Sequence, residues 1–95
     1  MHFPIGIYRV RDRSMEPEFH DGDYVIVNRW PRRFNIGDVV VAEHPRKTML
    51  LLKRVQSTAQ NGYFLVGDNK GQSTDSRHFG VVRARSVIGK VIAKV

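Results

Sequence analysis

Ser14 is the first residue of this sequence whose surroundings point to chemistry. It lies in the segment Asp-Arg-Ser-Met-Glu-Pro at positions 12–17. Pro17 has a fixed φ and disfavours the α-helical region at Glu16, so we expect the serine to lie on a sharply defined bend. A bend presents the hydroxyl to a ligand and lets nearby backbone amides face an oxyanion. The alternative is an ordinary turn serine.

A serine hydroxyl is a weak nucleophile at neutral pH and needs a base, for which Lys53 is the best candidate. Strand alternation places Lys53 on the same face as Met49, Leu51 and Val55. Desolvation on such a face disfavours the ammonium form, and a lysine pKa falls by about 3–5 units when burial is complete. A neutral amine can accept the serine proton. The alternative is a lysine that extends from a sheet edge into water.

The four histidines offer no comparable base, because none has a spacing that marks a catalytic triad. His20 lies in an acidic turn and His44 precedes Pro45, so we expect both to be exposed loop residues.

A polar loop, Gly-Asp-Asn-Lys-Gly-Gln-Ser-Thr-Asp-Ser-Arg-His-Phe-Gly, occupies positions 67–80. Such residues form hydrogen bonds with the backbone. Asp75 and Arg77 can form an ion pair that orders the loop, and Ser73 can offer its hydroxyl to a neighbouring amine. Asp68 and Asn69 suit turn capping. The loop lacks the carboxylate spacing of a calcium site and the Gly-Lys-Ser/Thr run of a phosphate loop, so we expect no metal and no cofactor.

The elements that must position these residues are predicted to be strands, because short apolar runs alternate with Gly/Asp turns. Helical signals are weak, and only Ser14 to Phe19 could form a single turn. We therefore predict a mainly β fold: one small, partly closed antiparallel β-barrel or sheet over residues 1–95. SH3-like and OB-like barrels would show the same pattern. The predicted strands are 7–10, 24–27, 39–42, 49–55, 63–66, 81–83 and 87–95, with a hairpin turn at Asn61-Gly62 and a possible bulge at Gly89.

Composition excludes some classes of protein. The chain has no cysteine, so disulfides and thiolate metal sites are absent. No apolar run reaches the roughly 18 residues that a membrane span needs, and the first residues lack the features of a secretory signal. We expect a cytoplasmic protein, or a membrane-associated one if the sequence is a piece of a longer chain. The net charge of +7 and Trp30 between Arg29 and Pro31 leave a small nucleic-acid-binding β module open as an alternative.

Five segments taken together resemble the type I signal peptidase family of serine–lysine proteases. The matches come in the family's order, from Val10 to Val91. The related LexA-type self-cleaving repressors lack the last motif, which places this chain on the signal peptidase side. The segments are Ser-Met-Glu-Pro at 14–17, the Gly-Asp strands at 22–27 and 37–41, Lys-Arg-Val at 53–55, and Gly-Asp-Asn, Ser, Asp-Ser-Arg and Gly within 67–80.

The resemblance implies a role for each matching residue. Ser14 would be the nucleophile, with its backbone amide donating to the oxyanion, and Lys53 would be the general base. Ser73 would hydrogen-bond to the Lys53 amine and orient it. Asp75 and Arg77 would form a structural ion pair.

Two further residues of the same loop receive weaker assignments from the resemblance. Ser76 would line the site. His78 would be a bystander, which agrees with its lack of partners in the sequence.

The resemblance also implies how a precursor protein would bind. The peptide would lie extended between the strand that leads to Ser14 and the strand that leads to Lys53, and would add as a β-strand. No nucleic acid is expected as a partner, and the oligomeric state is left open. The pocket for small side chains would involve Val10, Met15, Phe19 and Leu52.

Three departures from the family pattern bear on function. Asp12 stands where the family has Ser or Gly, and because a carboxylate repels an oxyanion, we predict that Asp12 points away, toward an arginine. Glu18 replaces the usual Thr after Pro17. The membrane segment and the large extra β domain of bacterial signal peptidases are missing, as they are in the short branch that includes nickel-type superoxide dismutase maturation proteases.

The leading hypothesis is a serine endopeptidase that removes an N-terminal leader from a precursor such as a superoxide dismutase. The alternatives are cleavage of secretory presequences with the membrane anchor missing, the nucleic-acid-binding module, and a scaffold that has lost catalysis. Intact Ser14, Lys53 and Ser73 argue against the scaffold.

Overall fold

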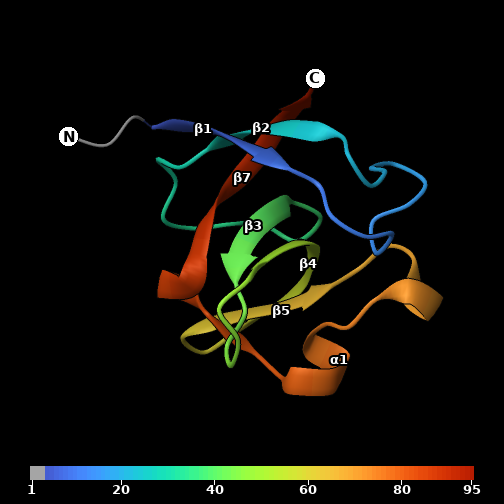
Figure 1. Ribbon diagram of the computed structural model, residues 1–95. Coiled ribbons are helices and arrows are strands. Elements are labelled where there is room, and N and C mark those ends of the chain that lie inside the picture. Colours follow the sequence, from blue (N-terminus) through green and yellow to red (C-terminus); the bar gives the residue numbers. More distant parts are fainter. Residues whose placement is uncertain (1–3) are drawn as a thin grey trace.

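The computed structural model describes residues 4–95, and residues 1–3 lie outside the described part. Antiparallel pairing joins seven strands into one sheet in the order β1-β2-β7-β3-β4-β5-β6 (Figure 1). The strands are Ile5–Arg9 (β1), Tyr24–Asn28 (β2), Val39–Glu43 (β3), Leu50–Ala59 (β4), Gly62–Val66 (β5), Val82–Arg83 (β6) and Val87–Lys94 (β7). This arrangement confirms the mainly β, antiparallel fold class.

The strands form where apolar runs end at turn residues, as the sequence predicts. At the β4–β5 hairpin, Ala59 pairs with Gly62, and Asn61 has a φ of 69°. Asn tolerates this left-handed conformation better than most residues, which explains why the chain reverses there. The bulge predicted at Gly89 lies beside it: Val41 faces Gly89 and Ala42 faces Val87, so Ile88 is the extra residue of β7.

β3 is buried on both faces because it lies between two core clusters. Val40 and Ala42 pack into one cluster with Val55 and Leu65. On the other face, β3 contributes to a second cluster beneath the Ser14 turn. The members of this second cluster are Val10, Met15, Phe19, Val25, Val27, Val39 and Val41. Double-sided burial explains why residues 39–42 form a continuous apolar run rather than an alternating one.

The single turn expected at Ser14 to Phe19 is present, and in it the Phe19 amide donates to the Met15 carbonyl at 3.0 Å. The helical structure inside the polar loop was not predicted. An α-helix begins inside this loop, at Ser76–Phe79 (α1), with two short 3-10 turns at Lys70–Gln72 and Ala84–Ser86. The α1 helix has only four residues, so its position is determined by its capping residues and not by a periodic pattern of apolar residues.

The sheet is curled, and this brings strands that are far apart in the strand order to the same groove. β1 and β4 are separated by β2, β7 and β3, yet residues of both face a cavity of about 500 Å³. The described residues contain no helix with the length and apolar character to cross a membrane. The curled sheet therefore brings the strand before Ser14 and the strand that carries Lys53 to opposite walls of the same groove.

Candidate active site

Ser14 lies on a tight turn that is held in place by hydrogen bonds from the polar loop. The Asn69 backbone amide donates to the Ser14 carbonyl at 2.8 Å, and the Asn69 side-chain amide donates to the Arg13 carbonyl at 3.1 Å. Ser14 itself is 4% exposed. The bend expected from Pro17 is therefore present, and contacts from Asn69, more than fifty residues later in the chain, hold it in place.

Lys53 lies in β4, opposite Val40 of β3, and is only 3% exposed. Its neighbours on the same face of β4, Leu51 and Val55, are also buried. This burial lowers the pKa of the Lys53 amine, since desolvation disfavours the ammonium form. The charges of Asp12 and Asp75 oppose that change and Arg77 adds to it, so the pKa remains below its ordinary value.

Neither the Ser14 hydroxyl nor the Lys53 amine has a hydrogen-bond partner among residues 4–95. Both groups are nevertheless linked to the same surroundings. Asp12 binds the Ser14 amide and acts on the charge of Lys53. A hydroxyl and an amine that have no hydrogen bond within the described residues are available to a substrate.

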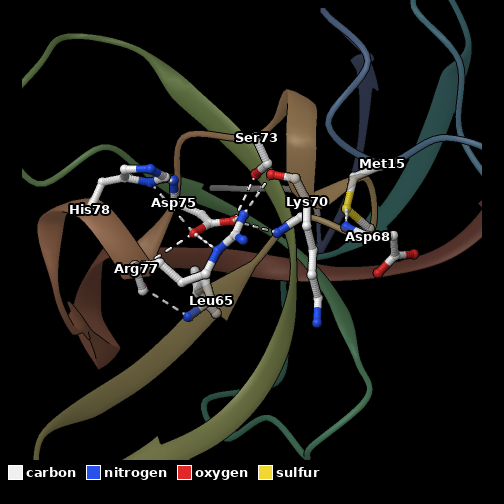
Figure 2. Close-up of polar contacts among 10 residues, drawn as sticks. Met15, Leu65, Asp68, Lys70, Ser73, Asp75, Arg77 and His78 are labelled. Atoms are coloured by element: carbon white, nitrogen blue, oxygen red, sulfur yellow. Dashed lines mark hydrogen bonds and ion pairs between the residues drawn. The ribbon is translucent and has the colours of Figure 1, made fainter.

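Asp75 is the hub of the polar loop, as Figure 2 shows. It is fully buried and accepts hydrogen bonds from the Gly67 amide at 2.8 Å and the Ser73 hydroxyl at 2.7 Å. Arg77 forms the expected ion pair through Nε to Oδ1 at 2.9 Å and Nη2 to Oδ2 at 3.0 Å. Burial alone would raise the Asp75 pKa, but the Arg77 guanidinium and these hydrogen bonds hold it well below its usual range. Asp75 is therefore an anion that organises the loop.

The position of Ser73 differs from its expected contact with the Lys53 amine. The Ser73 hydroxyl donates to Asp75, which leaves the lone pairs of its oxygen free to accept. Gly67 packs against this serine so closely that an added Cβ would collide with the Ser73 side chain and lie 2.7 Å from the Ser14 carbonyl oxygen. Only glycine fits between Ser73 and the Ser14 turn.

Arg54 is a positioning residue that sequence reasoning did not single out. Its guanidinium binds both carboxylate oxygens of Asp68, at 2.9 and 2.8 Å, and Glu18 at 2.8 Å. These contacts raise the pKa of the Arg54 guanidinium, chiefly through the bond to Asp68. Arg54 thus joins β4, immediately after Lys53, to the polar loop and to the turn after Ser14. Strand alternation, which places Arg54 on the face of β4 opposite Lys53, is the sequence signal that could have identified it.

The groove contains only part of the expected substrate-binding set. Val10 and Leu52 line it, together with Asp12 and Lys53. Met15 and Phe19 do not: they are 1% and 6% exposed and pack in the second core cluster. A contact of Met15 and Phe19 with the substrate therefore stays a prediction. The turn after Ser14 directs both side chains into the second core cluster.

Asp12 contradicts the prediction that it points away from the oxyanion position. Its Oδ1 atom accepts a hydrogen bond from the Ser14 amide at 2.9 Å. The residue has a φ of 70°, and its own amide donates to Asp21 at 2.7 Å. In this left-handed turn the short acidic side chain folds back on the backbone two residues later, which is a common local bond for Asp.

The remaining loop residues have structural roles. Ser76 is buried, and its hydroxyl accepts from the Leu65 amide at 2.9 Å, so it supports β5. His78 completes a capping box by accepting from the Asp75 amide through Nδ1 at 3.3 Å. His44 caps its own loop by accepting from the Arg46 amide, and its ring lies tilted against Phe79, with ring centroids 4.7 Å apart. His2 lies outside the described residues.

Comparisons with known proteins agree with this arrangement. The sequence matches the family described as Peptidase S24-like over residues 3–92. It is also similar to "Signal peptidase I V" of Bacillus subtilis (strain 168), with 24% identity over 88% of this chain and 82% of that protein. The family match spans the Ser14 turn, β4 with Lys53, and the polar loop. The chain therefore belongs to the Peptidase S24-like family.

Proposed function

We propose that this chain is a serine endopeptidase in which Ser14 is the nucleophile and Lys53 the general base. The burial of Lys53 on an apolar strand face carries the proposal, because it lowers the pKa of an amine that has no bonded carboxylate. The substrate is a protein precursor whose extended segment lies in the groove between β1 and β4.

The proposed reaction conserves atoms and charge at each step. The neutral Lys53 amine takes the proton from the Ser14 hydroxyl as Oγ bonds to the scissile carbonyl carbon. The carbon–nitrogen bond then breaks, and the Lys53 ammonium returns that proton to the leaving amine. A water molecule, deprotonated by Lys53, attacks the carbonyl carbon of the acyl-enzyme ester. The bond from this carbon to Oγ then breaks, and the Lys53 ammonium returns the proton to Oγ, which releases the new carboxyl end and restores the Ser14 hydroxyl.

Removal of either dyad member tests this mechanism. Ser14→Ala and Lys53→Ala should each reduce kcat by about a thousandfold or more, because members of one catalytic unit act together. Lys53→Arg should be equally inactive, since a guanidinium stays protonated. Cleavage would be followed by mass spectrometry on a mixture of unfolded protein substrates, with folding checked by thermal unfolding.

Matched controls separate chemistry from general damage. Ser57→Ala and Lys47→Ala change the same residue types at exposed positions, and both should keep wild-type rates. A Ser14→Ala enzyme that cleaves as fast as the wild type would rule out the proposed nucleophile, and full activity of Lys53→Arg would rule out proton transfer by Lys53.

The class of precursor distinguishes two versions of the function. Removal of a leader from a precursor such as a superoxide dismutase rests on the sequence resemblance. Cleavage of secretory presequences is favoured by the similarity to the Bacillus protein, whose name describes a signal peptidase. Offering purified enzyme both a leader-bearing superoxide dismutase and synthetic presequence peptides decides between them by which one is cut at a single site.

A further inference from the structure

The Ser14 amide already has a hydrogen-bond acceptor within the protein, and that acceptor is negatively charged. Asp12 Oδ1 lies 2.9 Å from the Ser14 nitrogen. The contact is built into the loop, because the Asp12 amide is in turn held by Asp21 at 2.7 Å. Asp12 itself is exposed and lines the groove. Its side chain can therefore turn away from the amide without loss of core packing.

A carboxylate at this position acts against the proposed reaction in two ways. It occupies the amide that would donate to the oxyanion, and two anions cannot share that donor without repulsion. It also favours the ammonium form of Lys53, which cannot accept a proton.

The charged groups that act on Lys53 are few. Asp12 and Asp75 favour the ammonium, and Arg77 disfavours it. Asp75 is neutralised by its ion pair with Arg77. On the groove side, Arg9 and Arg11 are the other charged residues beside Asp12 and Lys53. Asp12 is thus the carboxylate near Lys53 that lacks a bonded cation among residues 4–95.

We propose that Asp12 controls the rate of the proposed peptidase: its carboxylate caps the Ser14 amide in the free enzyme, and the substrate carbonyl must displace it before Ser14 can react. The proposal rests on the proposed function of the Ser14–Lys53 pair. It assigns to this chain a resting state in which the oxyanion donor is covered by an anion. Substrates that bind the groove strongly enough to move Asp12 would be cleaved in preference to peptides that do not.

The isosteric variant Asp12→Asn tests the proposal. Asparagine keeps an oxygen that can accept from the Ser14 amide, so the turn is preserved, but it removes the charge. We expect kcat to rise about tenfold with KM little changed, because the gain is made in the transition state. The acid limb of the pH–rate profile should also move to lower pH, since Lys53 loses a charge that raises its pKa.

One variant controls for the change in net charge, and a second variant of Asp12 covers a failure of the first to fold. Glu43→Gln makes the same change in net charge at an exposed position of β3, and it should leave both rate and pH profile unchanged. Asp12→Ser provides a second test if the asparagine variant does not fold, since serine also caps turns through its side chain. Thermal unfolding of each variant shows whether the fold is retained.

A readout that needs no cleavage separates this proposal from the proposed function. In the Ser14→Ala background, the pH midpoint for acylation of Lys53 by a small amine-reactive reagent should fall when Asp12→Asn is added. If wild type and both Asp12 variants cleave nothing, the proposed function fails. If wild type cleaves but the folded Asp12 variant is no faster, or the Lys53 midpoint does not fall, the role of Asp12 is overturned while the function stands.

Discussion

Under the proposed function, Lys53 would support activity at a cost to the stability of the fold. The Lys53 side chain is 3% exposed and its amine has no hydrogen-bond partner among residues 4–95, which costs folding free energy because a charged amine loses much of its hydration. A residue that weakens the fold and yet faces a groove beside Asp12 is typical of a functional site. The surrounding apolar strands must offset that cost.

Lys53→Met should therefore stabilise the protein while abolishing cleavage. We expect a gain of about 1–2 kcal/mol in the free energy of unfolding, because methionine fills a similar volume without a charge. Chemical denaturation of wild type and variant measures this difference. Lys47→Met, at an exposed position, should change stability far less.

The pH dependence of that gain has a definite sign. The pKa of Lys53 is lowered in the folded state, so between this lowered pKa and the ordinary lysine pKa the unfolded chain binds more protons than the folded one. The Lys53 contribution to wild-type stability then rises with pH across this window. The advantage of Lys53→Met should be largest below the window and shrink within it. An advantage that grows with pH would mean that Lys53 is not desolvated in the folded state.

At the scale of elements, the site is formed where three segments meet: the turn after β1, the strand β4 and the loop after β5. Asn69 and Arg54 tie these segments together. Arg54 makes its bonds to Asp68 and Glu18 from the strand face opposite Lys53, so it fixes β4 without entering the groove. Figure 1 shows the loop with α1 beyond the end of β5.

Gly67 lies where the loop after β5 packs against the Ser14 turn, with no room for a Cβ atom. Gly67→Ala should reduce both stability and cleavage, since the new methyl group collides with Ser73 and presses on the Ser14 carbonyl. We expect a loss of about 1–3 kcal/mol, the usual cost of overpacking. Differential scanning calorimetry and cleavage assays measure the two effects.

Gly71→Ala is the matched control in the same loop. A Cβ at Gly71 meets nothing within 4 Å, and its backbone does not have the positive φ that would strain alanine. This variant should be neutral in both assays. Equal losses for Gly67→Ala and Gly71→Ala would show that the loop is sensitive to any substitution and that the close approach at Gly67 has no special role.

For the whole molecule, the excess of positive charge bears on the choice of partner. The net charge is +7, and Arg9 and Arg11 carry part of it into the groove. Neither arginine has an ion-pair partner among residues 4–95. A nucleic-acid-binding module would use such charges without regard to peptide sequence, whereas a peptidase would use them to select acidic residues in the segment that fills the groove.

Reversal of the two groove charges tests this selection. Arg9→Glu combined with Arg11→Glu should lower kcat/KM about fivefold for peptides with acidic residues in the groove segment and raise it for basic ones, since exposed pairs contribute about 1 kcal/mol or less. Arg46→Glu combined with Arg85→Glu makes the same charge change outside this groove. If both double variants shift the preference equally, overall charge and not the groove is responsible.

Binding of a fluorescent oligonucleotide, measured at two salt concentrations, distinguishes the proposed peptidase from a nucleic-acid-binding module. Weak binding that vanishes at moderate salt is the ordinary behaviour of a basic surface. Tight, sequence-dependent binding that the groove variants abolish would favour the nucleic-acid module instead.

Local patterns in the chain were sufficient to predict the strands and the burial of Lys53. Alternation has a period of two, so each residue's face follows from its neighbours, and turns at residues such as Asn61 and Gly62 mark where strands end. The Asp75–Arg77 pair was predictable for the same reason, because its partners are only two residues apart.

Contacts between distant segments required the folded structure. The direction of the Met15 and Phe19 side chains depends on the core beneath the turn, and Arg54 finds its carboxylates only after β4 and two loops have come together. The Asp12 side chain folds back on the Ser14 amide because the loop takes a left-handed turn held by Asp21. Chain-local alternation determines which face a side chain occupies, whereas long-range packing and backbone dihedrals determine which group it meets there.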